Sequence, residues 1–317
     1  MIQDSLQDQI EVPVPIANTS FNQLYLYAFA TLFEVRTHVR TNTIEDDSKR
    51  LDEIINQWTA LQAEVATLCN AEIGLADSAK TYQIPPKYRS RLDEIANDEL
   101  FHKTFSNVQN TFELVDIDTL VAPQRSVNLD YVKDLKRKYK DKTSIEELIE
   151  ICLSPTREMP PISHLEQQNM HIFSSQNLDL RFLGAFLKKL TPEDLQYTEI
   201  GGSPAAAIIS FIGYGGSPIN VLKCDNRLVL NNGFHRVYAL RQLGVTQIPV
   251  VVQHVKNFQL EFPPIVAGLP REYLMGVQRP VLIKDFFHKD FCINLRAKMR
   301  VKIVTLQTAS GQFDVPT

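Results

Sequence analysis

The stretch from Arg227 to Val252 reads RLVLNNGFHRVYALRQLGVTQIPVVV, and it decides the fold of the region around it. The first four residues predict a strand, and Asn231-Asn232-Gly233 predicts a tight turn. A helix is expected from Phe234 to Leu243, followed by Gly244, a residue suited to a left-handed helix cap. Ile248 to Val252 predicts a buried strand. The segment therefore has the order strand, turn, helix, strand.

The turn in this segment has the features of a phosphate-binding corner. A tight Asn/Gly turn lets backbone amides approach an anion without obstruction by side chains. The helix that follows presents unpaired N–H groups and the positive end of its dipole to the same place. His235 and Arg236 lie in the first turn and can add charge-assisted hydrogen bonds. A Walker loop is absent, because the chain has no GxxxxGK[ST] pattern.

The residues upstream of this segment alternate between predicted strands and helices. Ser217 to Lys223 predicts a strand that pairs with RLVL across a turn at 224–226. Further upstream, Phe112 to Leu120 predicts a strand and 121–128 a loop. Helices are predicted at Leu129–Lys140, with a strongly basic outer face, at Ser144–Leu153, at Asp179–Leu190 and from Thr191-Pro192 onward.

The first hundred residues have a different character. They contain 8 basic and 16 acidic residues, whereas the remainder of the chain has a net charge of +4. Apolar residues recur at helical spacing in 21–40 and in 51–69, where Asp46 or Asp47 could cap the second helix, and 89–105 predicts a third. We expect a small antiparallel helical bundle, which either only packs together or also docks a protein partner through residues 20–105.

Length and composition place the chain among ordinary globular proteins. It has 317 residues, 44% hydrophobic and 22% charged, with a net charge of −4. This length favours about two domains, and the composition excludes disorder of the whole chain. The acidic start has no signal-peptide pattern, and the longest apolar stretch, Leu24 to Phe33, is too short for a membrane span. We expect a cytoplasmic protein.

Two segments, taken together, resemble the ParB and sulfiredoxin superfamily, whose members share a small α/β domain. Val115 to Leu135 (VDIDTLVAPQRSVNLDYVKDL) is similar to the opening strand and loop of that domain. Asn232 to Val252 (NGFHRVYALRQLGVTQIPVVV) is similar to its closing element, a strand followed by G-x-H-R, helix, Gly and strand. The resemblance spans Phe112 to His254, with an apparent helical insertion between them, and leaves both flanks of the chain uncovered.

Together with the patterns of the two uncovered flanks, the resemblance predicts an α+β chain in three parts. These are an N-terminal helical module (1–110), a ParB/sulfiredoxin-like domain (111–256, with the insertion at about 143–215) and a β-rich C-terminal extension (257–317). It also implies nucleotide triphosphate binding, with ATP or CTP and Mg²⁺ as the expected cofactors and with no haem, flavin or zinc. The residues expected to bind phosphate or nucleotide are Asn232, Gly233, Phe234, His235, Arg236, Gln124 and Arg125.

The chain departs from the family pattern at three points. Sulfiredoxins place their reactive Cys where this chain has Phe234, so sulfinic-acid reduction is not expected. Partition proteins carry a helix-turn-helix domain after this one, and no such pattern follows His254. Many relatives have Asp where this chain has Asn232, which weakens a role in metal-assisted phosphoryl transfer. Any catalysis would use His235 as the base, or a carboxylate such as Asp116 or Asp118.

Other features give weaker signals. The four cysteines are far apart and form no zinc pattern, and His164 and His171 have no cysteine nearby. Basic runs at 133–142 and 271–302 could follow a nucleic-acid backbone, but a solvated face is the simpler interpretation, and a nucleic-acid partner is not expected.

Two main functions remain open from the sequence, beside a DNA-processing enzyme that rests mostly on the family name. The first is binding of a nucleotide or other phosphorylated small molecule at the corner, with or without phosphoryl transfer or hydrolysis. The second is a non-enzymatic protein–protein adaptor that uses the fold as a scaffold.

Overall fold

The computed structural model describes residues 19–44, 48–155, 159–167, 169–195 and 202–312. The chain divides into two compact units. We call residues 18–156 and 216–298 the core unit, and residues 1–17, 157–215 and 299–317 the strand unit. Residue 110, expected as a domain boundary, lies inside the core unit. Phe101 and Phe105 explain this, because they pack in the same hydrophobic cluster as Val115.

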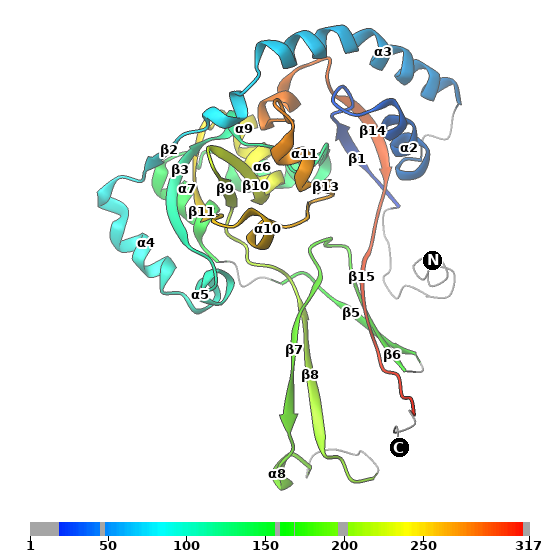
Figure 1. Ribbon diagram of the computed structural model, residues 1–317, viewed down its shortest axis with the longest axis vertical. Coiled ribbons are helices and arrows are strands. Elements are labelled where there is room, and N and C mark those ends of the chain that lie inside the picture. Colours follow the sequence, from blue (N-terminus) through cyan, green and yellow to red (C-terminus); the bar gives the residue numbers. More distant parts are fainter. Residues whose placement is uncertain (1–18, 45–47, 156–158, 168, 196–201, 313–317) are drawn as a thin grey trace, which may run out of the picture. The chain divides into compact units, whose positions relative to one another are not determined.

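The core unit contains both strands and helices (Figure 1). Its strands are β1 (Ser20–Tyr25), β2 (Thr81–Gln83), β3 (Asn110–Asp116), β4 (Ser126–Asn128), β9 (Asn220–Cys224), β10 (Arg227–Asn232), β11 (Gln247–His254), β12 (Ile265–Val266), β13 (Leu269–Pro270) and β14 (Ile293–Lys298). Its α-helices are α2 (Leu32–Asn42), α3 (Ser48–Ala71), α4 (Arg89–Ala96), α5 (Glu99–Phe105), α6 (Leu129–Tyr139), α7 (Ile145–Leu153), α9 (Phe234–Gln242), α10 (Phe258–Glu261) and α11 (Arg271–Gly276). Short 3-10 helices lie at Leu75–Ser78, Pro86–Tyr88, Ile117–Thr119 and Ile283–Phe287.

A five-stranded sheet with the order β10-β9-β11-β3-β2 forms the centre of the core unit. β9 and β10 form an antiparallel hairpin, and β11 runs parallel to β9 with Val251 opposite Asn220. The connection from β9 to its parallel partner β11 runs through β10 and α9, because parallel strands need a long crossover. This confirms the strand–turn–helix–strand order predicted for 227–252, including the left-handed Gly244 at φ 88° after the helix.

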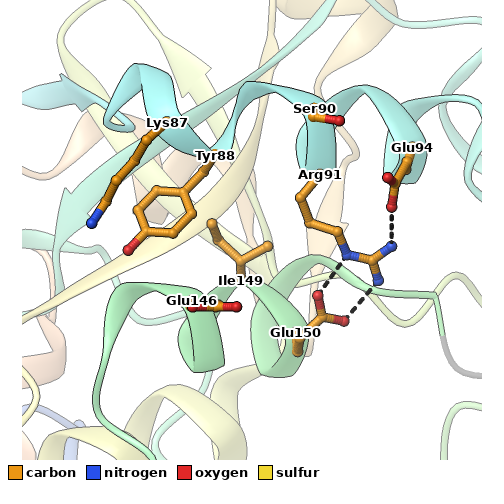
Figure 2. A pocket seen from close by; sticks show the side chains of 8 residues that line it. All are labelled: Lys87, Tyr88, Ser90, Arg91, Glu94, Glu146, Ile149 and Glu150. Atoms are coloured by element: carbon orange, nitrogen blue, oxygen red, sulfur yellow. Dashed lines mark hydrogen bonds and ion pairs between the residues drawn. The ribbon is translucent and has the colours of Figure 1, made fainter.

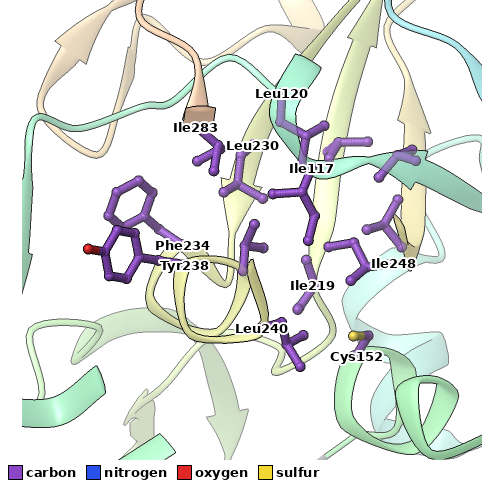
Figure 3. Close-up of a cluster of buried hydrophobic side chains, with 14 of the residues drawn as sticks. Ile117, Leu120, Cys152, Ile219, Leu230, Phe234, Tyr238, Leu240, Ile248 and Ile283 are labelled. Carbon is purple, nitrogen blue, oxygen red and sulfur yellow. The ribbon is translucent and has the colours of Figure 1, made fainter. Parts of the chain in front are cut away.

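The main hydrophobic core joins this sheet to the helices around it (Figure 3). Leu230 of β10 and Ile248 of β11 are fully buried, as are Ile219, just before β9, and Leu240 of α9. β11 is buried on both faces along Ile248 to Val252, which explains its continuous apolar run. The core also includes Cys152 of α7, one of four cysteines that are all free thiols.

A second sheet corrects the first helix expected from the sequence. Residues 20–25 form the strand β1, the middle of an antiparallel sheet with the order β14-β1-β4. Gln23 pairs with Leu295 on one side and with Asn128 on the other. The helix α2 begins only at Leu32. Thr31 is its N-cap, and Thr31 and Glu34 form a capping box at its start. The apolar spacing in 21–31 fits a helix locally, but pairing with a strand some 270 residues away decides its structure.

The expected all-helical N-terminal bundle is therefore wrong, although the helices in 51–69 and 89–105 exist. Residues 51–69 lie within α3, while 89–105 divides into α4 and α5 where Asp98 caps the second helix. The caps proposed for α3, Asp46 and Asp47, lie outside the described residues.

The strand unit overturns the expected helical insertion. Its described elements are β5 (Ser163–Gln167), β6 (Met170–Ser175), β7 (Arg181–Lys189), the single-turn helix α8 (Pro192–Leu195), β8 (Ala206–Gly213) and β15 (Lys302–Gln307). They form a sheet with the order β15-β6-β5 and a two-stranded hairpin of β7 and β8. The helix predicted at 179–190 is wrong, because this stretch pairs with β8 as a strand.

The C-terminal extension is less β-rich than expected. It contains α10, α11 and a 3-10 helix at Ile283–Phe287 besides its strands. The segment 281–283 lies on the opening loop, where the Ala122 amide donates to the Val281 carbonyl and the Ile283 amide to the Leu120 carbonyl, both at 2.9 Å. Within the described ranges, no helix has the length and apolarity that a membrane crossing needs.

Candidate phosphate-binding corner

The corner is formed where β10 ends and α9 begins. Gly233 is the N-cap of α9 and has a φ of 95°, in the left-handed region that favours glycine. A Cβ at this position would lie 2.7 Å from the Ile219 side chain, so close packing also requires glycine. Gly233 has no side chain with which to cap the first turn of α9. The first backbone amides of a helix have no intrahelical partner, and Gly233 supplies none from its side chain.

Asn232 and Arg236 hold the chain segment that leads into β9. The Asn232 side-chain amide donates to the Gly216 carbonyl at 2.7 Å and to the Pro218 carbonyl at 3.2 Å. The Arg236 guanidinium donates to the Ser217 carbonyl and, at 3.4 Å, to the Ile151 carbonyl. A guanidinium has five N–H donors, and these two bonds use two of them.

His235 is held by the opening loop of the domain. The backbone N–H of Asn128 donates to the Nε2 atom of His235 at 3.1 Å. Nε2 must then be unprotonated, so the neutral ring carries its proton on Nδ1. Burial lowers the pKa of His235 to about 4, which keeps the ring neutral at pH 7. The lone pair that a general base needs is already occupied by the Asn128 amide.

This hydrogen bond also brings two helix N-termini together. Asn128 is the N-cap of α6, and its side chain accepts from the Tyr131 amide at 3.0 Å. The Tyr131 ring meets the His235 ring edge-on, with 5.6 Å between centroids. The first turns of α6 and α9 are therefore neighbours, and both present the positive end of a helix dipole.

Phe234 is part of the core rather than a group that faces a ligand. It is buried and lies edge-on to Phe286, with 5.3 Å between ring centroids. Phe286 belongs to the C-terminal extension, so this extension covers the Phe234 side chain. An apolar ring at 234 fits this environment, because it buries surface against another ring.

The side chains of Gln124 and Arg125 bind groups outside the first turn of α9. The Gln124 side chain donates to the Ser126 carbonyl at 2.5 Å. Arg125 forms an ion pair with Glu34 at 2.6 Å and stacks over the Tyr273 ring at 5.2 Å from its centroid. The Arg125 Nε atom is buried and has no hydrogen-bond partner among the described residues. No hydrogen bond or ion pair in the described ranges joins Arg125 to Gly233 or Arg236, because Glu34 binds its guanidinium. The opening loop reaches the corner through Asn128 instead.

The two carboxylates considered as alternative bases lie near the other end of α9. Asp118 forms a fork with Arg241, in the last turn of α9, at 2.8 and 3.0 Å. Asp116 accepts from the Tyr82 hydroxyl at 3.0 Å and from Gln247 at 2.7 Å. Because a nine-residue helix is roughly 13 Å long, these carboxylates are remote from the first turn.

A buried charge network in the C-terminal extension was missed by sequence reasoning. Arg279 is almost fully buried and binds both Asp285 and Glu72 at 2.7 Å. Lys284 also binds Glu72, at 2.6 Å. Two cations of the supposed basic run at 271–302 are therefore neutralised by acidic partners. Glu72 lies over two hundred residues away in the sequence, so local charge counting could not reveal the pairing.

A separate surface pocket of about 420 Å³ lies between α4 and α7 (Figure 2). Its main charged groups are paired: Arg91 contacts Glu150 at 2.6 Å and Glu94 at 2.8 Å. The pKa of Glu150 is lowered chiefly by its hydrogen bond with Arg91. The pocket contains none of the predicted site residues.

The described residues were also searched for metal ligands, and the chain for known relatives. In the described part of the chain, no group of three or more His, Cys, Asp or Glu side chains is placed to hold a metal ion. Comparison of the chain with protein-family models, with curated proteins and with solved structures found no match.

Proposed function

We propose that this protein binds a nucleotide or other phosphorylated small molecule at the first turn of α9, without transforming it. The observation that carries the proposal is the uncapped start of α9 at Gly233, beside the N-terminus of α6. Two adjacent dipole ends and a set of unpaired backbone amides favour a bound anion. The resemblance of 232–252 to ParB and sulfiredoxin domains supports the same interpretation.

The remaining donors at the corner suit a phosphate group. The neutral His235 ring carries a proton on Nδ1, and Arg236 retains N–H donors beyond its two carbonyl bonds. Arg236 also supplies the positive charge of the first turn, since the pKa of His235 is about 4. Arg125, bound to Glu34, is not part of the proposed site.

Binding alone is proposed because the candidate catalytic groups are otherwise engaged. His235 accepts a hydrogen bond at the atom that would take a proton, and Asp116 and Asp118 lie near the opposite end of α9. A general base must reach the proton that it removes. We therefore assign no phosphoryl-transfer step to these residues.

Thermal unfolding of the full chain with ATP, CTP, GTP, their diphosphates and pyrophosphate tests the proposal, with and without Mg²⁺. A ligand at a hundredfold its Kd adds about 2.7 kcal/mol of stability. We expect such a gain in the wild type and in Arg241→Met, a control on the last turn of the same helix. Arg236→Met should lose most of it, and Arg236→Lys should retain part.

Two results would contradict the proposal. One is the absence of stabilisation by any of these phosphates at millimolar concentration. The other is equal stabilisation of the wild type and Arg236→Met. Far-UV circular dichroism of each variant checks that loss of the two carbonyl bonds of Arg236 has not unfolded the core unit.

A further inference from the structure

The β5–β6 hairpin of the strand unit carries two histidines whose ring nitrogens face each other. The Nε2 atom of His164, on β5, lies 3.2 Å from the Nδ1 atom of His171, on β6. The two ring centroids are 5.4 Å apart, so the nitrogens are the parts of the rings that are turned toward each other. A hydrogen bond between them requires an N–H on one ring and a lone pair on the other.

The register of the hairpin produces this juxtaposition and adds a carboxylate to it. Glu166 pairs directly with His171, and His164 pairs with Phe173, two residues further along each strand. Directly paired residues, and residues two apart along a strand, lie on the same face. The Oε2 atom of Glu166 is 4.0 Å from the Nδ1 atom of His171. Two imidazole nitrogens and one carboxylate oxygen are therefore neighbours on one face of the hairpin.

The backbone that carries these side chains is held in a sheet. β6 is the middle strand of the order β15-β6-β5 (Figure 1). Near the turn of the hairpin, the Asn169 side chain donates to the Thr308 carbonyl at 2.6 Å, and the Thr308 amide donates to the Asn169 carbonyl at 3.1 Å. The His164 ring also lies against the Phe173 ring, with 4.7 Å between centroids. Side chains on paired strands are positioned more precisely than side chains on loops.

We propose that His164 and His171 together bind a divalent transition-metal ion such as Zn²⁺ or Cu²⁺. Two imidazole nitrogens on one tetrahedral zinc lie about 3.3 Å apart, because each Zn–N bond is about 2.0–2.1 Å long. The distance of 3.2 Å between the facing nitrogens matches this spacing. Imidazole suits zinc, copper and nickel, whereas Mg²⁺ and Ca²⁺ prefer oxygen ligands. The nature of the donors therefore selects the class of metal.

Metal binding requires only small changes in the two rings. The ring that donates the hydrogen bond moves its proton to its other nitrogen through solvent, so that both facing nitrogens carry lone pairs. Each ring then turns about its Cβ–Cγ bond to point its lone pair at the ion, and the energy minimum of that torsion is broad. Both side chains have room to turn, because His164 is exposed and the His171 side chain is 45% exposed.

Two histidines leave several coordination positions of the ion open. Structural zinc sites have four protein ligands and catalytic ones have three, and the described residues contain no set of that size. Glu166 places a negative charge beside the ion, and water fills the open positions. The proposed site therefore binds its metal reversibly at the surface. It lies within the strand unit and does not depend on the proposed phosphate site.

Isothermal titration of the full chain, free of any affinity tag, with Zn²⁺ tests the proposal. We expect a site with a micromolar Kd. His164→Gln and His171→Gln should each raise this Kd about tenfold or more, because even groups that touch a metal only through its ligands commonly contribute that much to affinity. His102→Gln is the matched control, since His102 is exposed on α5 in the core unit. It should leave the Kd unchanged.

Electron paramagnetic resonance of bound Cu²⁺ then identifies the ligand atoms. The wild type should show the hyperfine pattern of two nitrogen ligands, which His171→Gln should lose. Far-UV circular dichroism of the variants should match the wild type, because both histidines lie at the surface. A chain that binds no Zn²⁺ at high micromolar concentration overturns the proposal. So does a Kd that the double variant His164→Gln with His171→Gln leaves unchanged, or a Cu²⁺ spectrum without a second nitrogen.

Discussion

The strands around α9 and the β7–β8 hairpin have similar apolar composition but very different surroundings. Val250, Val251 and Val252 of β11 are fully buried, whereas Leu187 and Ile208 of the hairpin are largely exposed. β11 has strands on both sides and lies in a core that includes residues of α7 and α9. Among the described residues, each strand of the hairpin pairs only with the other. An apolar strand therefore predicts that cover exists, but not whether the same chain supplies it.

The two regions also differ in how their charged groups are used. Arg279 is buried in the core unit and is held by Asp285 and Glu72. Arg181, at the start of β7, pairs with Asp179 while both side chains remain substantially exposed. A buried charge depends on its partners because desolvation is costly, whereas an exposed one has water as an alternative. The comparison thus predicts that replacing Arg279 by alanine lowers the free energy of unfolding much more than replacing Arg181 by alanine.

The largest expected effect is that of Arg279→Ala. It leaves Asp285 buried without its cation, and we expect a loss of about 3–5 kcal/mol in the free energy of unfolding. Arg181→Ala should change this quantity by less than about 1 kcal/mol. Urea unfolding of the full chain measures both, followed by the fluorescence of Trp58 for the core unit and by far-UV circular dichroism for the whole chain. Arg279→Met combined with Asp285→Leu should recover most of the loss, because no buried charge of the pair then remains.

Similar effects of Arg279→Ala and Arg181→Ala would contradict this account of the two regions. Trp58 is a suitable reporter for the core unit because its indole N–H donates to the Ala30 carbonyl at 2.9 Å. It is also the only tryptophan in the chain.

A smaller contrast is expected between two isoleucines. Ile248→Ala, in β11, removes a fully buried side chain and should cost about 2–5 kcal/mol. Ile208→Ala, in β8, should cost less than about 1 kcal/mol, because the side chain is largely exposed and chiefly strand propensity changes. Urea unfolding of the full chain, followed by far-UV circular dichroism, measures both. If Ile208→Ala were as costly as Ile248→Ala, another part of this chain would have to cover the hairpin.

The same comparison explains which parts of the fold the sequence could predict. The elements from β9 to β11 were predicted because their turns and caps are local and because β9 pairs with both β10 and β11 within this stretch, although β11 also pairs with the distant strand β3. The hairpin strand β7 was predicted as a helix because Leu183, Ala185, Leu187 and Lys188 are good helix formers. Its identity as a strand depends on β8, beyond a stretch of some sixteen residues. β1 was misassigned for the same reason, since its partner β14 lies at the opposite end of the chain.

The candidate site was predictable only in part. Gly233 could be placed at the start of α9 because a glycine between a strand and a helix has few other roles. The roles of Arg125 and His235 could not be foreseen, because they depend on groups distant in the sequence. Glu34 forms an ion pair with the Arg125 side chain, and the Asn128 backbone N–H donates a hydrogen bond to the Nε2 atom of His235. The similarity of 232–252 to a known motif pointed to the corner, but it gave no sign that Glu34 binds Arg125 or that Asn128 binds His235.

The smallest expected effect concerns pH and His235. Its pKa is about 4 in the folded protein, below the ordinary value of 6.5, because burial disfavours the charged ring. Between these two values the unfolded chain binds more protons than the folded one. The stability that the neutral ring contributes is fully present above about pH 6.5 and is lost as the pH falls toward 4. We expect a loss on the order of 1–3 kcal/mol over this window.

His235→Gln isolates this contribution. The glutamine side-chain oxygen can accept a hydrogen bond from the Asn128 amide, and it does not titrate. The variant should therefore lose less stability than the wild type between pH 6.5 and 4, while both retain the response of the carboxylates. Urea unfolding at a series of pH values measures the difference. Parallel curves for the two proteins would mean that His235 is accessible to protons in the fold, and that the Asn128 bond does not hold its ring neutral.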